Sequence, residues 1–526
     1  MEKKAIGKET YIFIAIAVIA VLARIWAFGA VPAGVHQDGA MAAVDAKALA
    51  DYGTDRFGMA WPVHLTAWGY GQMSALMTYL MAAVIKLFGM SVVTIRIPNL
   101  LLSLAGLAAL YAFARDAFRS KMVALVVLAF AAINPWHIMQ SRWALDCNLF
   151  PHLFMIGLYL VHKGATEKRL RFVLLSMVSF ALCLYAYGIA LYSVPLFLVA
   201  LCAVMLCKRM IDWRGALLAL GVFLLVAWPI LAMVVINFFR WPSIELPFMT
   251  IPFFADSVRS RDMLFFSETP LAQLWMNAKY LVRTVVLQQE WRPWHATPGY
   301  GQMYLFSMPF AVWGFVRMVM RAIREKKENF GLLSILMALG MGVWAGLITP
   351  VTTHRINIIF YFIILLAAYG IYELCARVKH VKWAVLAAYA VAFVMFISAY
   401  FTTGAALIRE WFWADMNNAL TYAATVESDS YVIVQDFPEM MDGPQMAVIL
   451  TAYTHQLDAE YVQSAAYAER YTFINGKNFA AVEMDATKVY IIQNAAQSVC
   501  SEADFDLVAF GEAIVAIPKE FADFAD

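Results

Sequence analysis

The sequence predicts a polytopic α-helical membrane protein with a small α/β domain at its C-terminal end. Hydrophobic residues make up 63% of the 526 residues, and charged residues make up 14%. Apolar runs of about 16 to 22 residues recur between short basic clusters, which is the pattern of helices that cross a bilayer. After about residue 405, polar residues become frequent and alternating runs typical of strands appear.

The first apolar run covers residues 10–29. It has no small-residue cleavage signal, so we expect it to be retained as a span. Later apolar segments bring the total to about eleven transmembrane helices. These segments cover residues 96–114, 122–136, 149–163, 172–187, 189–207, 215–236, 302–320, 331–348, 356–373 and 383–402.

The Lys and Arg clusters predict the orientation, because cytoplasmic loops carry an excess of these residues. All clusters fall on the cytoplasmic side only if the apolar stretch 73–88 is a juxtamembrane or re-entrant helix of the first outer loop. The N-terminus is then cytoplasmic and the C-terminus extracytoplasmic. With no targeting peptide, this pattern fits a multi-pass protein of a bacterial cytoplasmic membrane. The clusters lie at the N-terminus and at residues 115–121, 163–171, 208–214, 321–327 and 377–382.

We divide the chain into a membrane part, residues 1–404, and an extracytoplasmic α/β domain, residues 405–526. The second part has strand-like runs at 431–434, 488–492 and 507–510 and neither a Gly-rich phosphate loop nor a metal-ligand cluster. We therefore expect it to dock an acceptor or to support the fold. The six cysteines lie mostly in apolar runs without metal-ligand spacing, which argues against a disulfide scaffold or a zinc site.

Asp38 is the strongest candidate for chemistry. It follows the first apolar run, at the mouth of the first span, where an acidic residue is costly unless it has a function. A carboxylate that faces a water-filled cavity there is suited to act as a general base. The alternative is a solvated loop carboxylate, and the polar and aromatic character of the segment that follows favours function.

Four motifs resemble the GT-C class of membrane glycosyltransferases, in the branch of protein O-mannosyltransferases and bacterial aminoarabinose transferases. The resemblance covers about residues 20–370. In that family the first-loop motif is usually Asp-Glu, whereas here Gly39 follows Asp38. The order and spacing of the motifs carry the match: residues 32–38, residues 87–91 with 96–98, residues 141–146 with Asn148 and Pro151, and residues 354–357.

The resemblance implies an enzyme that transfers a sugar from a polyprenyl-phosphate donor to an extracytoplasmic acceptor, which could be a protein, a lipid or a cell-envelope glycan. It implies that Asp38 is the catalytic base of a one-step, inverting displacement. Asp146 matches the second acidic position of the family. It orients the acceptor, shares a divalent metal ion with Asp38, or pairs with Arg142, and these alternatives stay open. We expect the lipid bilayer but no nucleic acid as a partner.

Cations must stabilise the departing phosphate, and we expect them from Arg24, His64, His354 and Arg355. Arg355, at the outward end of a late helix, is the best single candidate. Arg24 lies within the first apolar run, where an unpaired guanidinium is costly. It either snorkels to the interface, pairs with a carboxylate such as Asp38, or binds the lipid phosphate.

Weaker substrate-binding candidates come from the predicted outer loops. Their aromatic members could stack on a sugar ring or belong to the aromatic belt at the membrane interface. These candidates are His36, Gln37, Trp68, Tyr70, Arg142, Arg292 and His295.

Other functional classes fit the sequence less well. A lipid-linked sugar transporter or flippase is expected to have inverted repeats and broken helices near the midplane of the bilayer, and the sequence shows neither. A non-catalytic scaffold does not require acidic and basic residues on one side. An oligosaccharide ligase or polymerase would use a polyprenyl-diphosphate donor, so the released phosphate distinguishes it from the first hypothesis.

Overall fold

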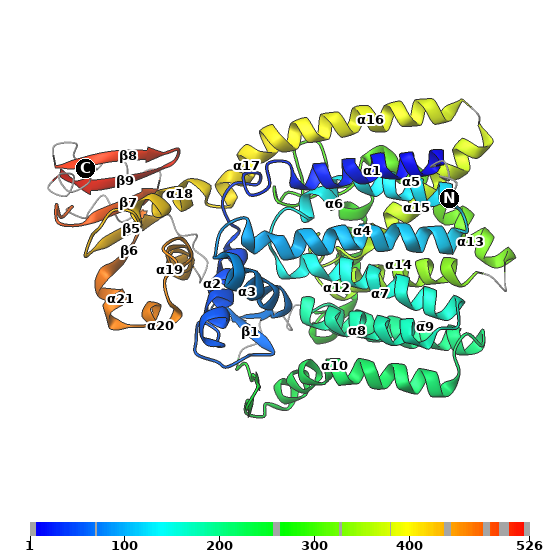
Figure 1. Ribbon diagram of the computed structural model, residues 1–526, viewed down its shortest axis with the longest axis horizontal. Coiled ribbons are helices and arrows are strands. Elements are labelled where there is room, and N and C mark those ends of the chain that lie inside the picture. Colours follow the sequence, from blue (N-terminus) through cyan, green and yellow to red (C-terminus); the bar gives the residue numbers. More distant parts are fainter. Residues whose placement is uncertain are drawn as a thin grey trace, which may run out of the picture.

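The computed structural model describes residues 7–68, 71–255, 263–325, 329–378, 380–435, 443–476, 484–493 and 504–519. Figure 1 shows a bundle of long helices that carries a smaller lobe with a β-sheet at one end. We call the end of the bundle next to the lobe the site end. The opposite end, where α7 joins α8 and α9 joins α10, is the basic end.

The bundle confirms the prediction of a mostly helical membrane fold, because each predicted span contains a helix. Seven helices in the described residues are long and apolar enough to cross a membrane. The exact number of spans stays a prediction; α5, for example, has 12 residues and is about 18 Å long. The helices are α1 (Lys8–Ile25), α4 (Ile97–Phe118), α5 (Lys121–Ala132), α7 (Leu149–Thr166), α8 (Leu170–Ala186), α9 (Ala190–Cys207), α10 (Trp213–Phe239), α13 (Met308–Arg324), α14 (Phe330–Ile348), α15 (Ile359–Arg377) and α16 (Val381–Ala399).

Two glycines let α13 and α15 pack closely. A Cβ atom at Gly314 would collide with the carbonyl oxygen of Leu366, and one at Gly370 would collide with the carbonyl oxygen of Phe310. Small residues at a helix interface allow backbones to approach, which is how helices associate where no water drives them together. This contact holds the middle of α15 against α13.

The segment between α1 and α4 forms a cap at the site end. It contains α2 (Gln37–Tyr52), the antiparallel hairpin of β1 (His64–Ala67) and β2 (Gly71–Ser74), α3 (Leu76–Phe88) and the short helix η1 (Thr94–Arg96). Figure 1 places α2 and α3 between the bundle and the lobe. The apolar stretch 73–88 thus contains a helix, α3, and its predicted juxtamembrane or re-entrant position stays a prediction.

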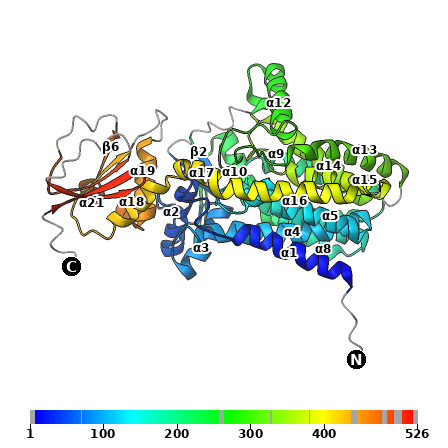
Figure 2. The same cartoon turned by 90° about the horizontal axis from the view of Figure 1, so that it is seen from above.

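Shorter elements complete the site end. Figure 2 shows that α12 projects sideways from the bundle. These elements are α6 (Pro135–Gln140), η2 (Asp146–Asn148), the hairpin of β3 (Ile244–Leu246) and β4 (Met249–Ile251), η3 (Leu264–Phe266), α12 (Pro270–Val285) and η4 (Leu305–Ser307).

The lobe contains a five-stranded sheet in the order β6-β5-β7-β9-β8. Strand β5 is parallel to β6 and β7, whereas β9 is antiparallel to β7 and β8. The chain reaches the lobe through η5 (Tyr400–Gly404) and α17 (Ala405–Trp411), which continue α16, so the division at residue 404 stays a prediction. The elements are α18 (Ala414–Ala423), β5 (Tyr431–Gln435), α19 (Gly443–Thr454), α20 (Ala459–Val462), α21 (Ala465–Arg470), β6 (Tyr471–Asn475), β7 (Val489–Gln493), β8 (Phe505–Phe510) and β9 (Ala513–Pro518).

Candidate active site between the bundle and the lobe

Asp38 lies in the first turn of α2, where the helix dipole favours a negative charge. Its Oδ1 atom accepts a hydrogen bond of 2.9 Å from Nε1 of Trp68. Its backbone N–H donates to Nδ1 of His36, which caps the helix, over 3.2 Å. The Asp38 side chain is 26% exposed, so the carboxylate is held in place and can still be reached from solution.

The loop before Asp38 is fixed from two sides. Arg96 donates from its guanidinium to the carbonyl oxygens of Pro32 at 2.8 Å and Gly34 at 2.6 Å. From the other side, the carbonyl of Phe412, at the end of α17, accepts a hydrogen bond of 2.8 Å from the backbone of Val35. The position of Asp38 therefore depends on η1 and on the approach to the lobe.

The structure gives a physical reason for Gly39. A Cβ atom at this position would lie 3.0 Å from the carbonyl oxygen of Ala144, which is tight for a carbon–oxygen contact. The first turn of α2 is thus packed against the segment that leads to Asp146. A glutamate at residue 39 would require this segment to move.

Asp146 is buried and starts η2, where its Oδ1 accepts a hydrogen bond of 2.7 Å from the backbone of Cys147. The side chain of Asn357, just before α15, donates to the Cys147 carbonyl over 2.7 Å. Two predicted motifs, residues 141–146 and 354–357, therefore meet at this turn. Both were expected to contribute to one site.

Arg142 caps the C-terminal end of α1. Its guanidinium donates to the carbonyl oxygens of Arg24 at 2.9 Å and Trp26 at 2.6 Å, and also to Ala23, Ala27 and Val31. The last carbonyls of a helix lack partners within the helix, so this arrangement stabilises the end of α1. The contacts give Arg142 a structural role and argue against its predicted role in substrate binding.

Arg24 is fully buried in the bundle. Its guanidinium donates to Nδ1 of His137 and to the carbonyl oxygens of Ala20, Ala131 and Ala132, at 2.7 to 3.2 Å. Burial excludes snorkelling to the interface, and these contacts replace the suggested pair with Asp38. The structure thus argues against Arg24 as a ligand of the donor phosphate, because its donors join α1 to α5 and α6.

Arg355 differs from these two arginines. It lies in the α14–α15 loop and is partly exposed, and its Nη1 atom donates to the carbonyl oxygen of Pro350 over 3.2 Å. In the described part of the chain no carboxylate forms an ion pair with it. A cation of this kind, near the Asp146 turn, is available to a phosphate.

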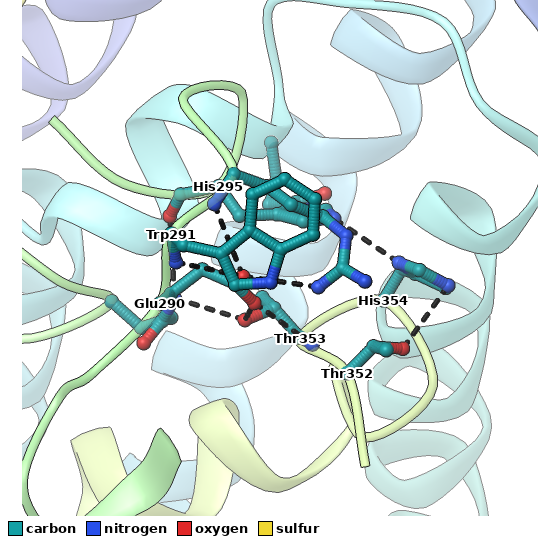
Figure 3. A network of polar contacts seen from close by, with 9 residues as sticks. Glu290, Trp291, His295, Thr352, Thr353 and His354 are labelled. Carbon is teal, nitrogen blue, oxygen red and sulfur yellow. Dashed lines mark hydrogen bonds and ion pairs between the residues drawn. The ribbon is translucent and has the colours of Figure 1, made fainter. Parts of the chain in front are cut away.

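A chain of hydrogen bonds supports the Arg355 loop (Figure 3). Gln140 donates to Nδ1 of His295 over 2.8 Å, Nε2 of His295 lies 3.2 Å from Nδ1 of His354, and Nε2 of His354 lies 3.1 Å from Oγ1 of Thr352. The amide nitrogen of Gln140 can only donate, so Nδ1 of His295 accepts and Nε2 of His295 carries the proton. His354 in turn accepts at Nδ1 and donates from Nε2 to Thr352, so both imidazoles are Nε2–H tautomers. Burial lowers the pKa of His295 to about 3, although Glu290 opposes this shift.

Glu290 also holds the Arg355 loop, through one of its two carboxylate oxygens. Its Oε2 accepts a hydrogen bond of 2.7 Å from the hydroxyl of Thr353, and its Oε1 accepts one of 3.1 Å from the guanidinium of Arg292. Burial acts to raise the pKa of Glu290, but His295, Thr353 and Arg292 together lower it. Arg292 also lies over the ring of Trp291, 4.4 Å from its centroid. These contacts give Arg292 a structural role, and its role in substrate binding stays a prediction.

An aromatic cluster joins Asp38 to this network. The ring of His36 lies 5.3 Å from that of Trp143 and 5.2 Å from that of Trp294, and Trp143 lies 5.8 Å from His295. Burial lowers the pKa of His36, against the effect of Asp38. The imidazole is thus a neutral cap that packs between loops.

The remaining candidates lie around the hairpin. Trp68 follows β1 and donates to Asp38, while Gln37 lines a narrow pocket with Trp68 and Gln435 of the lobe. His64 is buried at the start of β1, opposite Ser74, with its ring 6.1 Å from that of Phe254. Tyr70 lies outside the described residues.

Several residues of the site escaped the sequence analysis. Glu290, Gln140 and Thr353 carry no local signal, because their partners lie on other loops. Arg96 and Asn357 lay within the recognised motifs, which was the available signal for them. In the residues described, no group of three His, Cys, Asp or Glu side chains is arranged to hold a metal ion, and a metal shared by Asp38 and Asp146 stays a prediction.

Residues 73–232 match the model of the dolichyl-phosphate-mannose-protein mannosyltransferase family. No curated protein matches the sequence significantly. Among solved structures, ArnT from Cupriavidus metallidurans bound to undecaprenyl phosphate is similar with a TM-score of 0.56 and 12% identity, over 97% of this chain and 98% of that chain.

The oligosaccharyltransferase of Archaeoglobus fulgidus is also similar, with a TM-score of 0.52 and 13% identity, over 93% of this chain and 70% of that chain. These relatives are glycosyltransferases of the GT-C class, and the apolar helices agree with a multi-pass membrane protein. The chain therefore has the fold of these glycosyltransferases, the GT-C fold that its motifs predicted.

Proposed function

We propose that the protein transfers a sugar from a polyprenyl-phosphate donor to an extracytoplasmic acceptor, with Asp38 as the base. One observation carries this proposal: Asp38 is a partly exposed carboxylate at a helix N-terminus, fixed by Trp68 and preceded by a loop that Arg96 and Phe412 hold in place. The similar ArnT structure holds undecaprenyl phosphate, which supports a lipid phosphate as the donor. The site and the lobe would lie outside a bacterial cytoplasmic membrane, with the N-terminus inside.

The chemistry follows from the charges. Asp38 takes the proton of the acceptor hydroxyl while its oxygen attacks the anomeric carbon, and the bond from this carbon to the phosphate oxygen breaks. Arg355 compensates the charge of the departing phosphate. Asp146 in η2 and His354 beside Arg355 in the chain are further candidates for this position, as is His64 in the hairpin. A single displacement inverts the anomeric centre.

A second candidate function is transfer from a polyprenyl diphosphate. The similarity of this fold to that of the oligosaccharyltransferase is the observation that supports this second candidate. Such an enzyme releases a diphosphate, whereas the first proposal requires a monophosphate. A flippase moves the intact lipid and releases neither product.

The test is product identification with the wild-type protein in lipid nanodiscs. Polyprenyl-phosphate and polyprenyl-diphosphate sugars are supplied with acceptor fractions of protein, lipid and cell-envelope glycan, in the presence of divalent metal or chelator. We expect release of polyprenyl monophosphate together with an inverted glycoside. Release of diphosphate would support the ligase, and turnover only with metal would support a shared ion between Asp38 and Asp146. Movement of intact donor between leaflets without release would contradict both enzyme proposals.

A further inference from the structure

An apolar cavity lies in the half of the bundle next to the basic end, far from Asp38. Its volume is about 620 Å³, and α7, α8, α9 and α10 line it. Its floor includes the buried residues Val173 and Met205, whereas its rim includes Val199 and Leu217, which are 69% and 57% exposed. We call this cavity the basic-end groove.

The groove lies between α9 and α10, two successive helices that pack mainly against other helices. Helix α10 packs mainly against α8, whereas α9 packs mainly against α14 and less extensively against α8. The space between α9 and α10 is therefore left to small and exposed apolar side chains such as Ala216. The rim side chains face outward from the bundle, where the acyl chains of a bilayer would lie.

The depth of the groove matches one leaflet. On α10 its lining runs from Trp213 to Phe223, which corresponds to about 15 Å along the helix. The hydrocarbon core of a bilayer is about 30 Å thick, so the groove covers about half of it. Its size also falls within the roughly 300–1,000 Å³ of known ligand pockets. An extended acyl chain of a single leaflet fits these dimensions.

The mouth of the groove is cationic. The α7–α8 and α9–α10 turns both lie at this end, and their carboxylates are already engaged: Glu167 pairs with Arg169 at 3.4 Å, and Asp212 caps α10 by accepting from the backbone of Gly215 at 2.9 Å. Trp213 lines the groove, and the guanidinium of Arg214 lies over its ring, 5.3 Å from the centroid. The cations of the two turns are Lys163, Lys168, Arg169, Arg171, Lys208, Arg209 and Arg214.

We propose that the basic-end groove binds an anionic phospholipid, with an acyl chain in the groove and the phosphate at Arg171 and Arg214. The apolar lining alone would accept any chain, whereas the cations select a negative headgroup, as basic pockets between transmembrane helices do. By the predicted orientation this lipid belongs to the cytoplasmic leaflet. The site does not depend on the proposed transfer reaction, because it lies at the other end of the bundle.

Native mass spectrometry of the full-length protein in detergent tests this proposal. The protein is titrated with dioleoyl phosphatidylglycerol and with dioleoyl phosphatidylcholine, which have the same acyl chains. We expect tighter binding of phosphatidylglycerol. Arg171→Gln and Arg214→Gln should each weaken it about fivefold and leave phosphatidylcholine unchanged. Ala216→Trp should fill the groove and weaken both lipids.

The matched control is Arg324→Gln, which removes an exposed cation of the basic end from α13, a helix that does not line the groove. It should leave both affinities unchanged. Equal binding of the two lipids, or an equal loss in the control, would overturn the proposal. Competition by polyprenyl phosphate at the same stoichiometric site would instead assign the groove to the donor lipid. If Ala216→Trp does not fold, the two arginine variants still decide the question.

Discussion

At the site end of the bundle, Arg24, Arg96 and Arg142 are buried and donate mainly to backbone carbonyls. At the basic end, by contrast, Arg171 and Arg214 are exposed and lie beside aromatic rings. A buried guanidinium is costly unless its donors are satisfied. At the site end carbonyls, together with one imidazole for Arg24, satisfy them, so no carboxylate is consumed. The comparison teaches that the buried arginines hold the backbone around the site. It supports our proposal that Arg355, which lies between these extremes, binds the charged phosphate.

The largest expected effect is that of Asp38→Asn. The amide keeps the size of the side chain but cannot take a proton, so sugar transfer should fall by about 100-fold or more. Turnover is measured as released polyprenyl phosphate in nanodiscs. Asp506→Asn, which changes an exposed carboxylate of β8, is the control and should keep the wild-type rate. A wild-type rate in Asp38→Asn would end the assignment of the base.

Arg355→Gln should follow, with a loss of about 100-fold in turnover, because a group that stabilises developing charge has an effect of this size. The melting temperature should change little, since the side chain is partly exposed and makes one backbone contact of 3.2 Å. The opposite result would be a lower melting temperature for Arg355→Gln together with a wild-type turnover rate for the protein that stays folded. That result would place Arg355 with the structural arginines.

Arg142→Met should have the opposite profile. It removes the donors that cap α1, and we expect a loss of about 3 kcal/mol in the free energy of unfolding. Arg171→Met at the basic end is the comparison and should change stability by about 0.5 kcal/mol or less. Unfolding is followed by detergent titration with tryptophan fluorescence. Similar stability of the two variants would remove the distinction between buried and exposed arginines.

The smallest effect concerns pH. His295 has a pKa of about 3 in the folded protein, below its ordinary value of 6.5, so the unfolded state binds the proton more readily. Its contribution to stability is present above pH 6.5 and is lost as the pH falls. Between pH 7 and pH 5 we expect a loss of about 2 kcal/mol. His295→Gln should flatten this dependence in melting experiments, and an unchanged slope would show that other groups cause it.

Much of the fold could be predicted, because it rests on local patterns. Apolar runs gave the helices of the bundle, and alternating runs gave β5, β7 and β8. Strands β6 and β9, at Tyr471–Asn475 and Ala513–Pro518, were not among the predicted strand-like runs. The motifs placed Asp38 just after the first span and Arg355 at the outward start of a late helix. In the structure Asp38 lies in the first turn of α2, and Arg355 lies in the loop before α15.

The assignments of Arg24, Arg142 and Arg292 could not be made in the same way. A sequence shows that an arginine is in an apolar run but not which carbonyls it reaches, and Arg24 contacts residues more than 100 positions away. The network of His295 and His354 depends likewise on two loops that meet only in the fold. Local patterns thus predict where charge occurs, and long-range packing decides whether it is used for structure or for substrate.

The central claim is that Asp38 acts in the chemical step. The most direct measurement is a single-turnover experiment on Asp38→Asn loaded with donor at saturation, together with the dissociation constant of the donor for the wild type and the variant. We expect the dissociation constant to stay within about threefold while the rate constant of transfer falls by about 100-fold or more. A variant that transfers at the wild-type rate once loaded, and that fails only because the donor binds poorly, would contradict the account.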